Sequence, residues 1–515
     1  MVDNWIPNGF PQNGDVGEDK LTKLLDTLGF KVESVTKTGA ISKNALNYKV
    51  KLIAPRNVQT SNYNHPIAAF GSNAEIYGFR VTCIFGSYNA EGLIARFKEI
   101  GNAENTLVLL DYALELPTRR SLARKIKAES GITKIFAVVD RVLMMYLVKN
   151  YDEMQINKIL MSLIMPFAAC QPYVFNPNVP IPPEIFMGRE KEMRRILDFD
   201  DVNIVYGGRQ LGKTALLKMA CASLDRNENN DRAILVSLDK CNCAAAALKI
   251  GQALRADEFF DEDFSDTYDW TKLAAAIKKR LASDAPYKIP HFMLALDEAD
   301  DFIKDCREID FKPVLELIDI QQQLHNGSRF KFVMAGLRDV VRFYRDEALG
   351  NNNQISKLPS LVVKPFDLED ATRLLKEPLR CLGLYFSDNE NADSLAMMIL
   401  ETTNYFPGLI QLYCARLIEA LSKSDYASYR ETDSPIYEIK EGHIQSVLGE
   451  ESFNEEIKNK INMTLRLGDD KFYYVIAHLM AWRYHNDDSI EGYSAKDILD
   501  TAEEFGIEEL LPQNS

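Results

Sequence analysis

A glycine-rich segment, Gly207-Gly208-Arg209-Gln210-Leu211-Gly212-Lys213-Thr214, contains the residues of this sequence best suited to chemistry. It fits the pattern G-x-x-x-x-G-K-[ST], in which glycines let consecutive backbone N–H groups surround phosphate oxygens at the start of a helix. Lys213 is expected to reach the β- and γ-phosphates, and the hydroxyl of Thr214 to bind Mg²⁺. The apolar run Ile204–Tyr206 precedes the segment and a helix-forming run follows it, which is the context of a P-loop; the alternative is a chance glycine-rich turn. The residues expected to bind the phosphates are Gly207, Gly208, Arg209, Gln210, Leu211, Gly212, Lys213, Thr214 and Ala215.

A second apolar run, Phe292–Leu296, ends in two acids, Asp297 and Glu298. Asp297 is expected to bind the Mg²⁺ ion together with Thr214, and Glu298 to orient and deprotonate the attacking water. The alternative is a strand followed by a solvated acidic turn, because the acidic charge continues through 300–301. The letters Asp-Glu-Ala-Asp at 297–300 also occur in helicases, but the helical C-terminal third offers no second helicase domain.

Five short apolar runs separated by helix-length segments predict a parallel sheet, because strands of such a sheet are buried on both faces. They are Ile204–Tyr206, Ile234–Leu238, Phe292–Leu296, Phe332–Ala335 and Leu361–Val363. We expect the run 234–238 to lie between the P-loop strand and the Asp297 strand, as in ATPases with a catalytic Glu. Arg338 follows the run 332–335 and is expected at the ligand edge of the sheet, where it would sense or compensate the γ-phosphate charge. Arg342 and Arg345 are expected on a solvated face.

The order of these patterns predicts about three domains, as does the length of 515 residues. Prolines are concentrated between 172 and 183, and proline fixes φ and lacks an N–H, so a linker is expected there. The expected segments are a loose tail (1–16), an N-terminal α/β domain (17–171), the linker (172–184), a P-loop ATPase domain (185–365), a helical lid without strands (366–435) and a winged-helix-like domain, incomplete in this sequence (436–515). The predicted fold class is therefore α/β.

Composition limits the class of protein further. The chain has 60 Lys+Arg against 75 Asp+Glu, a formal net charge of −15, which gives it no bulk affinity for nucleic acids. Its longest apolar run, Ile159–Cys170, is too short to span a bilayer, and its first residues do not resemble a secretory signal. Only Cys241 and Cys243 are close neighbours among the eight cysteines, without a second Cys/His pair for zinc. We therefore expect a reduced, cytoplasmic protein that does not enter a membrane.

The two flanking domains contain weaker signals. In the first, Asp111 and Glu115 follow an apolar run but no Glu-x-Lys follows, so a degenerate or regulatory domain is favoured over a nuclease. The basic segment 119–127 is expected to be a solvated helix face rather than a nucleic-acid contact. Near the other end, Ser494 and Asp497 predict a capping box. Nine acidic residues and one Lys lie between His485 and Leu510, which disfavours DNA binding there.

A family resemblance enters with Phe186-Met187-Gly188-Arg189-Glu190-Lys191-Glu192. This segment resembles the hhGRExE signature of STAND-class signalling ATPases and of their replication-initiator-like relatives within AAA+ proteins. The resemblance implies a nucleotide-pocket role for Gly188, Arg189 and Glu190. The segment 403–411 is similar to the sensor region of the family's lid, where Pro407 would touch the nucleotide, although Asn404 or Tyr405 stands where the family has glycine. The segment 378–386 also resembles this lid.

The resemblance implies ATP and ADP as cofactors, with Mg²⁺, and a switch rather than a motor. In such switches bound ADP holds the ATPase closed, and exchange for ATP leads to self-association and activation of a sensor or effector protein. The domain order also looks like that of ATPases from bacterial anti-phage systems. One alternative is a replication-initiator-like ATPase that binds or remodels DNA; another keeps the site only as a structural ADP pocket.

Overall fold

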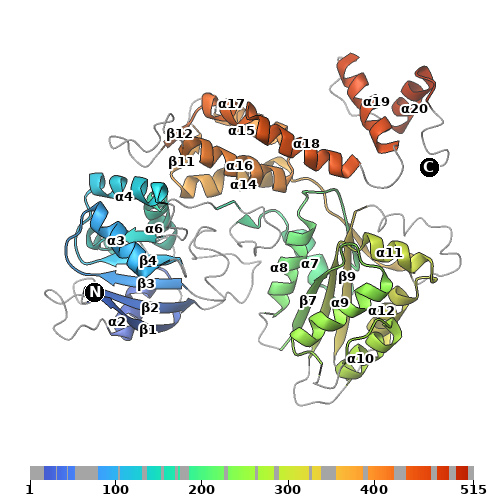
Figure 1. The fold of residues 1–515 in the computed structure, drawn as a ribbon, viewed down its shortest axis with the longest axis horizontal. Coiled ribbons are helices and arrows are strands. Elements are labelled where there is room, and N and C mark those ends of the chain that lie inside the picture. Colours follow the sequence, from blue (N-terminus) through green and yellow to red (C-terminus); the bar gives the residue numbers. More distant parts are fainter. Residues whose placement is uncertain are drawn as a thin grey trace. The chain divides into compact units, whose positions relative to one another are not determined.

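A computed structural model describes most of the chain (Figure 1). The described residues are 17–30, 32–42, 44–52, 79–101, 105–129, 136–151, 156–168, 172–173, 185–225, 230–260, 265–282, 289–323, 328–337, 355–386, 392–422, 437–465, 472–486 and 494–507. The predicted tail at 1–16, most of the predicted linker, and Arg338, Arg342 and Arg345 lie outside these ranges. The chain divides into two compact units, residues 1–444 and 445–515.

The first sheet is mixed and has the strand order β1-β2-β3-β4-β5 (Figure 1). Its strands are β1 (Val32–Ser42), β2 (Ala45–Leu52), β3 (Phe79–Ile84), β4 (Thr106–Leu110) and β5 (Phe136–Val139). The first three pair antiparallel, and β4 and β5 extend the sheet parallel to β3. Its helices are α2 (Glu18–Thr27), α3 (Ala90–Ile100), α4 (Leu116–Ala128), α5 (Arg141–Asn150) and α6 (Ile156–Ile164), with a 3₁₀ turn at Met165–Phe167. Strands and helices alternate after β3, which agrees with the α/β class predicted from the sequence.

Charged residues of this part have structural roles. The carboxylate of Asp111 accepts a hydrogen bond from the N–H of Gly86 (3.0 Å), so it acts as a turn residue. Arg119 is buried, donates to the carbonyl of Val138 (2.8 Å) and forms an ion pair with Asp140 (3.3 Å). The prediction of a solvated basic face is therefore wrong for Arg119, although Arg124 in the same helix is exposed. The reason is that Arg119 faces the end of β5, where the carbonyl of Val138 and the carboxylate of Asp140 receive it.

The second sheet consists of five parallel strands in the order β10-β6-β9-β8-β7. These are β6 (Ile204–Tyr206), β7 (Arg232–Ser237), β8 (His291–Asp297), β9 (Arg329–Gly336) and β10 (Ser360–Val362). All five predicted strands and their parallel arrangement are confirmed. The predicted place of the 234–238 strand is wrong: β7 is at the edge, and β9 lies between the P-loop strand β6 and the acidic strand β8. Crossover connections let parallel strands pair out of chain order, so sequence order does not determine sheet order.

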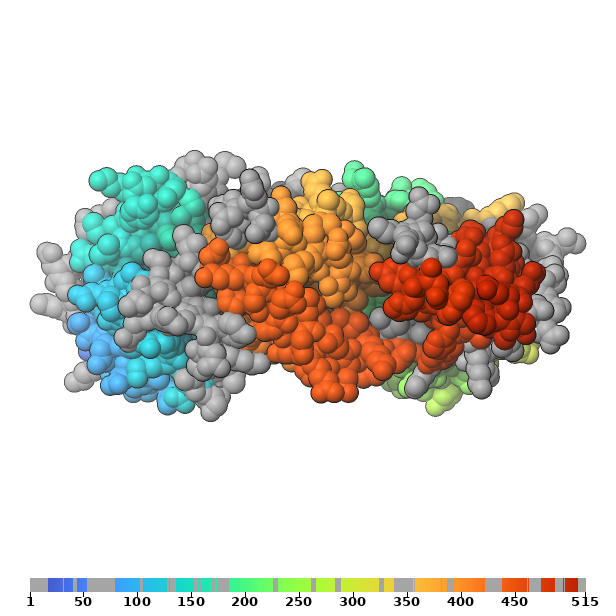
Figure 2. Space-filling model, turned by 90° about the horizontal axis from the view of Figure 1, so that it is seen from above, coloured from blue at the N-terminus to red at the C-terminus, as the bar shows by residue number. Residues whose placement is uncertain are grey.

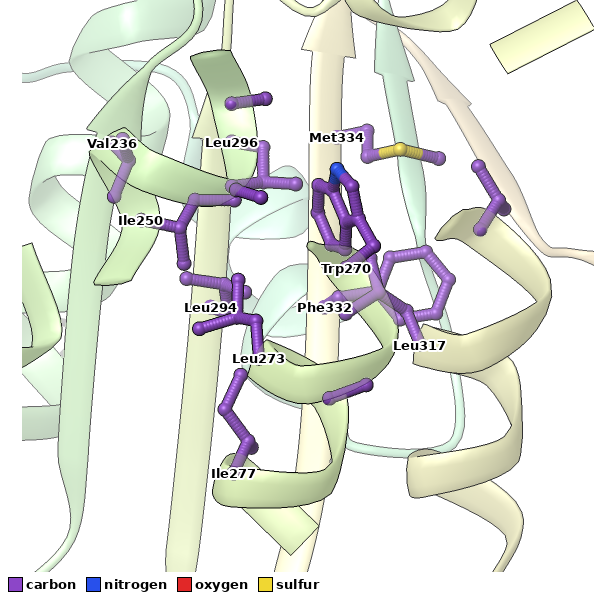
Figure 3. Packing of buried hydrophobic residues seen from close by; sticks show 14 of the residues in the cluster. Val236, Ile250, Trp270, Leu273, Ile277, Leu294, Leu296, Leu317, Phe332 and Met334 are labelled. Atoms are coloured by element: carbon purple, nitrogen blue, oxygen red, sulfur yellow. The ribbon is translucent and has the colours of Figure 1, made fainter. Parts of the chain in front are cut away.

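Both faces of this sheet are buried, because successive residues of each strand point to opposite sides. Leu294, Leu296 and Phe332 face a cluster that includes Trp270 and Leu317, as Figure 3 shows. The elements covering this face are α9 (Cys243–Ala256), α10 (Trp270–Ala282), α11 (Asp300–Arg307) and α12 (Lys312–Gln323). Residues between these positions in the strands face α7 (Glu190–Leu197) and α8 (Lys213–Asp225) on the other side. The buried sheet therefore fixes where each strand ends, and with it the positions of the loops at its carboxyl edge.

The region predicted as the helical lid follows β10, and we call it the lid. It contains α14 (Leu368–Cys381), β11 (Leu384–Phe386), α15 (Ala392–Thr402) and α16 (Pro407–Ser422). β12 (Tyr437–Ile439) and α17 (Glu441–Leu448) come next, in the region predicted as winged-helix-like. The prediction that this region lacks strands is wrong, because β11 pairs in parallel with β12. Each strand has only three residues and its partner is about 50 residues away, so no local pattern indicates the pair. Pro378 in α14 cannot donate to the carbonyl of Leu374, and the hydroxyl of Tyr173 donates to the neighbouring carbonyl of Leu375 (2.9 Å).

The second unit contains α18 (Glu451–Leu465), α19 (Phe472–Asn486) and α20 (Ala495–Glu504). The last two pack together through Leu479, Ile498 and Ala502 and form a compact block, dark red in Figure 2. The predicted capping box is confirmed, because Ser494 and Asp497 exchange hydrogen bonds at the start of α20. The described residues of this unit are helical, and its winged-helix nature stays a prediction. No helix in the described ranges has the length and apolar character needed to cross a bilayer.

Candidate functional site

The loop between β6 and α8 has a backbone shape that depends on its glycines. A Cβ atom at position 207 would lie 2.4 Å from the carbonyl oxygen of Val363, so only glycine fits there without movement of the backbone just after β10. Gly212 has a φ of +89°, which favours glycine, and Gln210 has a φ of +63°. The loop then runs directly into α8, whose first residue is Lys213. Backbone N–H groups of the loop and of the first helical turn are thus grouped at a helix N-terminus, as a phosphate site requires.

The ammonium group of Lys213 folds back over this loop. Its Nζ donates to the carbonyl oxygens of Gly207 and Gly208, each at 2.8 Å. Burial lowers its pKa to about 8, against the opposing effect of the nearby carboxylates of Asp297 and Asp300. Among the described residues, these two carbonyl oxygens are its hydrogen-bond partners. A partly desolvated cation that is bound only to neutral carbonyls fits an anionic ligand such as a phosphate group.

Two acids stand at the end of β8, in line with the prediction. Asp297 is buried, and one of its carboxylate oxygens accepts the N–H of Glu298 (3.0 Å). Glu298 is exposed and has a φ of +53°, a strained backbone for a residue other than glycine. Its carboxylate accepts a hydrogen bond from the hydroxyl of Ser237 at the end of β7 (3.1 Å). The side chain that would deprotonate a water is therefore held from the neighbouring strand.

Sequence reasoning missed Ser237 and Asp300. The carboxylate of Asp300 accepts the N–H of Leu337 (2.7 Å), and the N–H of Ala299 donates to the carbonyl of Ala335 (2.9 Å). These bonds join the start of α11 to the end of β9, next to the acids on β8. A usable signal existed, because Ser237 lies near the end of one predicted strand and Asp300 shortly after another, and the carboxyl ends of parallel strands meet at one edge.

Arg189 forms hydrogen bonds with the backbone of the P-loop and of the segment after β10. Its guanidinium donates to the carbonyl oxygens of Leu211 (3.1 Å) and Lys364 (2.7 Å) and to the carboxylate of Glu192 (2.9 Å). It also lies over the ring of Phe366, 4.6 Å from its centre, and is only 5% exposed. One guanidinium nitrogen, Nη2, donates to both carbonyls, which leaves Nη1 to donate to Glu192. Arg189 thus connects the P-loop to the segment that leads into the lid.

The neighbours of Arg189 in the predicted signature face the start of the lid helix α14. Gly188 has a φ of +65°, and a Cβ at this position would lie 2.4 Å from Cγ of Asp370. Burial raises the pKa of the Asp370 carboxyl, and the charges of Asp367 and Glu190 raise it further. Gly188 and Glu190 are therefore next to the first turn of α14.

The lid also contacts the P-loop directly through the start of α16. The N–H of Gly408 donates to the carbonyl of Gln210 (3.1 Å). Cγ of Pro407 is 3.9 Å from the position that a Cβ on Gly212 would take. The turn before α16 contains Tyr405 with a φ of +59°, whose carbonyl accepts the N–H of Phe366 (3.0 Å). The P-loop, the segment after β10 and this turn of the lid are therefore joined in a closed set of contacts.

The predicted site residues thus come together at the carboxyl edge of the second sheet, at the ends of β6 and β8 and under the start of α16. Arg209, Thr214 and Ala215 belong to the P-loop and the first turn of α8, and the Nε atom of Arg209 is buried without a partner among the described residues. Arg338 lies outside the described residues. The fold is α/β, and its site joins a G-x-x-x-x-G-K-T loop at the end of one parallel strand to two acids at the end of another.

No protein-family model matches the chain, and no curated protein matches it. Among solved structures, the ORC2 protein of Aeropyrum pernix in its ADPNP–ADP complexes is similar at 14% identity, over 66% of this chain and 85% of that one, with a TM-score of 0.42. A Walker-type ATPase of Pyrococcus abyssi is similar at 14% identity, over 62% and 89% of the two chains, with a TM-score of 0.37. Domain III of the replication initiation protein DnaA of Thermotoga maritima is similar at 14% identity, over 54% and 95%, with a TM-score of 0.30.

Proposed function

We propose that this chain binds ATP and hydrolyses it with Mg²⁺, and that it acts as a switch of the STAND type within the AAA+ ATPases. The observation that carries the proposal is the pairing of a P-loop on β6 with Asp297 and Glu298 on β8, while the lid is hydrogen-bonded to the same loop. A lid that touches the phosphate-binding loop is sensitive to what that loop binds. This coupling supports a switch, whereas the acid pair supports hydrolysis.

The chemistry divides among few side chains. The backbone N–H groups from Gly208 to Thr214 would hold the phosphates, and Lys213 would exchange its two carbonyl partners for phosphate oxygens. Thr214 and Asp297 would hold Mg²⁺, which supplies charge neutralisation at the phosphates. Glu298 would accept the proton of the attacking water while Ser237 fixes its carboxylate.

Lid movement would report the bound nucleotide. The hydrogen bond between Gly408 and Gln210 connects the start of α16 to the P-loop, and Arg189 connects the next residue of the loop, Leu211, to the segment before α14. A change in the P-loop when ATP replaces ADP would therefore reach the lid at the start of α16 and at the segment that leads into α14. We propose that this movement controls self-association and contact with a separate sensor or effector protein. By its resemblance to ATPases of anti-phage systems, the role would be bacterial signalling or defence.

The first test is nucleotide binding to the Lys213→Ala variant, measured by calorimetry with ATP and Mg²⁺. We expect the variant to lose binding, while the control Lys249→Ala, an exposed lysine on α9, binds as the parent does. Equal binding by Lys213→Ala and the parent would disprove the P-loop site. The switch itself is tested by the mass of the protein in solution: a larger assembly with ATP than with ADP supports it, and one unchanged mass contradicts it.

A second candidate is a replication-initiator-like ATPase that binds or remodels DNA. The observation in its favour is the packed helix pair α19 and α20, since two such helices can place one of them in a DNA groove. The acidic composition of residues 485–510 weighs against it. A shift of labelled duplex DNA that weakens steeply with salt would favour this function, and no shift at low salt would exclude it.

A further inference from the structure

By helical register, Gln411 lies on the same side of α16 as Pro407 and Gly408, the residues that meet the P-loop. Each residue of an α-helix is rotated by about 100° from the one before, so Gln411 lies about 40° from Pro407 and about 60° from Gly408 when viewed down the axis. Pro407 approaches Gly212, and Gly408 donates to Gln210. Viewed down the axis of α16, Gln411 therefore points between the directions of Pro407 and Gly408, and it lies about one turn further along the helix.

The amide oxygen of Gln411 has no partner there. Its Oε1 atom is buried, and no described residue donates a hydrogen bond to it. The opposite side of α16, with Ile410, Tyr413 and Leu417, is fully buried within the lid and consists of packed side chains. A buried carbonyl without a donor is unfavourable, so its presence on the face toward the P-loop indicates a donor that comes with a ligand.

The chemistry of a nucleotide limits what this donor can be. Ionised phosphate oxygens accept hydrogen bonds and do not donate them, so the phosphates held by the P-loop cannot satisfy Oε1. The nucleoside carries donors, namely the ribose hydroxyls and the amino group of adenine. We propose that Gln411 accepts a hydrogen bond from the nucleoside of the bound nucleotide. The lid then recognises the nucleoside while the P-loop binds the phosphates. This inference rests on the proposed binding of ATP.

The test compares nucleotides that lack one donor each. We would measure dissociation constants by calorimetry for the full chain and for Gln411→Met, whose side chain has nearly the same length without the amide. The ligands are ATP, 2′-deoxy-ATP, 3′-deoxy-ATP and purine riboside triphosphate, which lacks the 6-amino group. Gln411→Met should weaken ATP binding about tenfold, which corresponds to about 1.4 kcal/mol. Gln252→Met, at an exposed helical glutamine on α9, is the matched control and should leave binding unchanged.

The analogues distinguish the sources of the donor. If the base donates, the parent chain binds purine riboside triphosphate about tenfold more weakly than ATP, and Gln411→Met has no further effect on that ligand. If the ribose donates, one of the deoxy nucleotides shows this behaviour instead. Equal weakening of all four ligands by Gln411→Met, or none, would overturn the inference although the parent still binds ATP. Failure of the parent to bind any nucleotide would overturn the proposed function as well, and the two failures are therefore distinguishable.

Discussion

Replacing Gly408 by alanine tests whether the lid contacts the P-loop in solution, because the sign of the stability change depends on that contact. Gly408 is the second residue of α16. Alanine inside a helix is favoured over glycine by about 0.5–1 kcal/mol, so at a site with free space the substitution stabilises the protein. Gly442 is the matched control, since it is the second residue of α17 and an added Cβ there would meet nothing within 4 Å.

At position 408 the surroundings are crowded. The new Cβ would lie 2.3 Å from Oε1 of Gln210, 3.1 Å from its carbonyl oxygen and 3.2 Å from its Cβ. The amide end of the side chain can rotate away, but the backbone oxygen can move only with the P-loop. Overpacking of this kind costs about 1–3 kcal/mol, and the shift also weakens the hydrogen bond from Gly408. After subtraction of the alanine preference, we expect Gly408→Ala to be less stable by up to about 2.5 kcal/mol.

Thermal unfolding of the parent and the two variants measures the sign of each stability change. Hydrogen exchange then tests whether the contact between Gly408 and Gln210 exists. The transition temperature should fall for Gly408→Ala and rise for Gly442→Ala. In the parent, the N–H of Gly408 belongs to the first helical turn and has no acceptor within its own helix, so its protection from exchange reports the bond to Gln210. Stabilisation of Gly408→Ala by the same amount as the control, with an unprotected amide in the parent, would refute the contact.

Two further substitutions test other parts of the site, and a third tests Lys331, a buried lysine near the start of β9. Glu298→Gln should retain ATP binding but slow hydrolysis by about 10²–10⁴-fold in a phosphate-release assay, and no slowing, or equal slowing in the exposed control Asp301→Asn, would contradict a role as base. Arg189→Met leaves two backbone carbonyls without a donor, so it should lower the free energy of unfolding, measured in urea, by about 2–4 kcal/mol and weaken ATP binding. Unchanged ATP binding would contradict a role of Arg189 in holding the P-loop in place. Burial lowers the pKa of Lys331 to about 8, so between pH 8 and the unfolded value of 10.5 the unfolded chain binds more protons and the free energy of unfolding should rise with pH. Lys331→Met lacks this component, and a stability difference from the parent that does not change between pH 7 and 10 would show that Lys331 is not desolvated.

Local sequence patterns predicted the second sheet well because its strands are buried on both faces. A strand such as 292–296 must then be an unbroken apolar run, and the first polar residue after it marks the ligand edge. The P-loop and the acids Asp297 and Glu298 could be found for this reason. The position of β7 in the sheet could not be predicted, because strand order depends on how the crossover connections pack. The β11–β12 pair could not be predicted either, because its two strands are short and far apart in sequence.

The sequence by itself determined which residues are the candidates for binding phosphate and metal, because these functions require particular residue types at fixed spacing within one loop or at one strand end. Only the tertiary structure decided which residues support them. Ser237 reaches Glu298 from the next strand, and Arg189 bonds to carbonyls that follow it by 22 and 175 positions. Gly408 meets Gln210 from a different part of the fold. Such contacts depend on backbone atoms and close approach, which leave no residue pattern in the chain, so they become visible only when the packed elements place distant segments side by side.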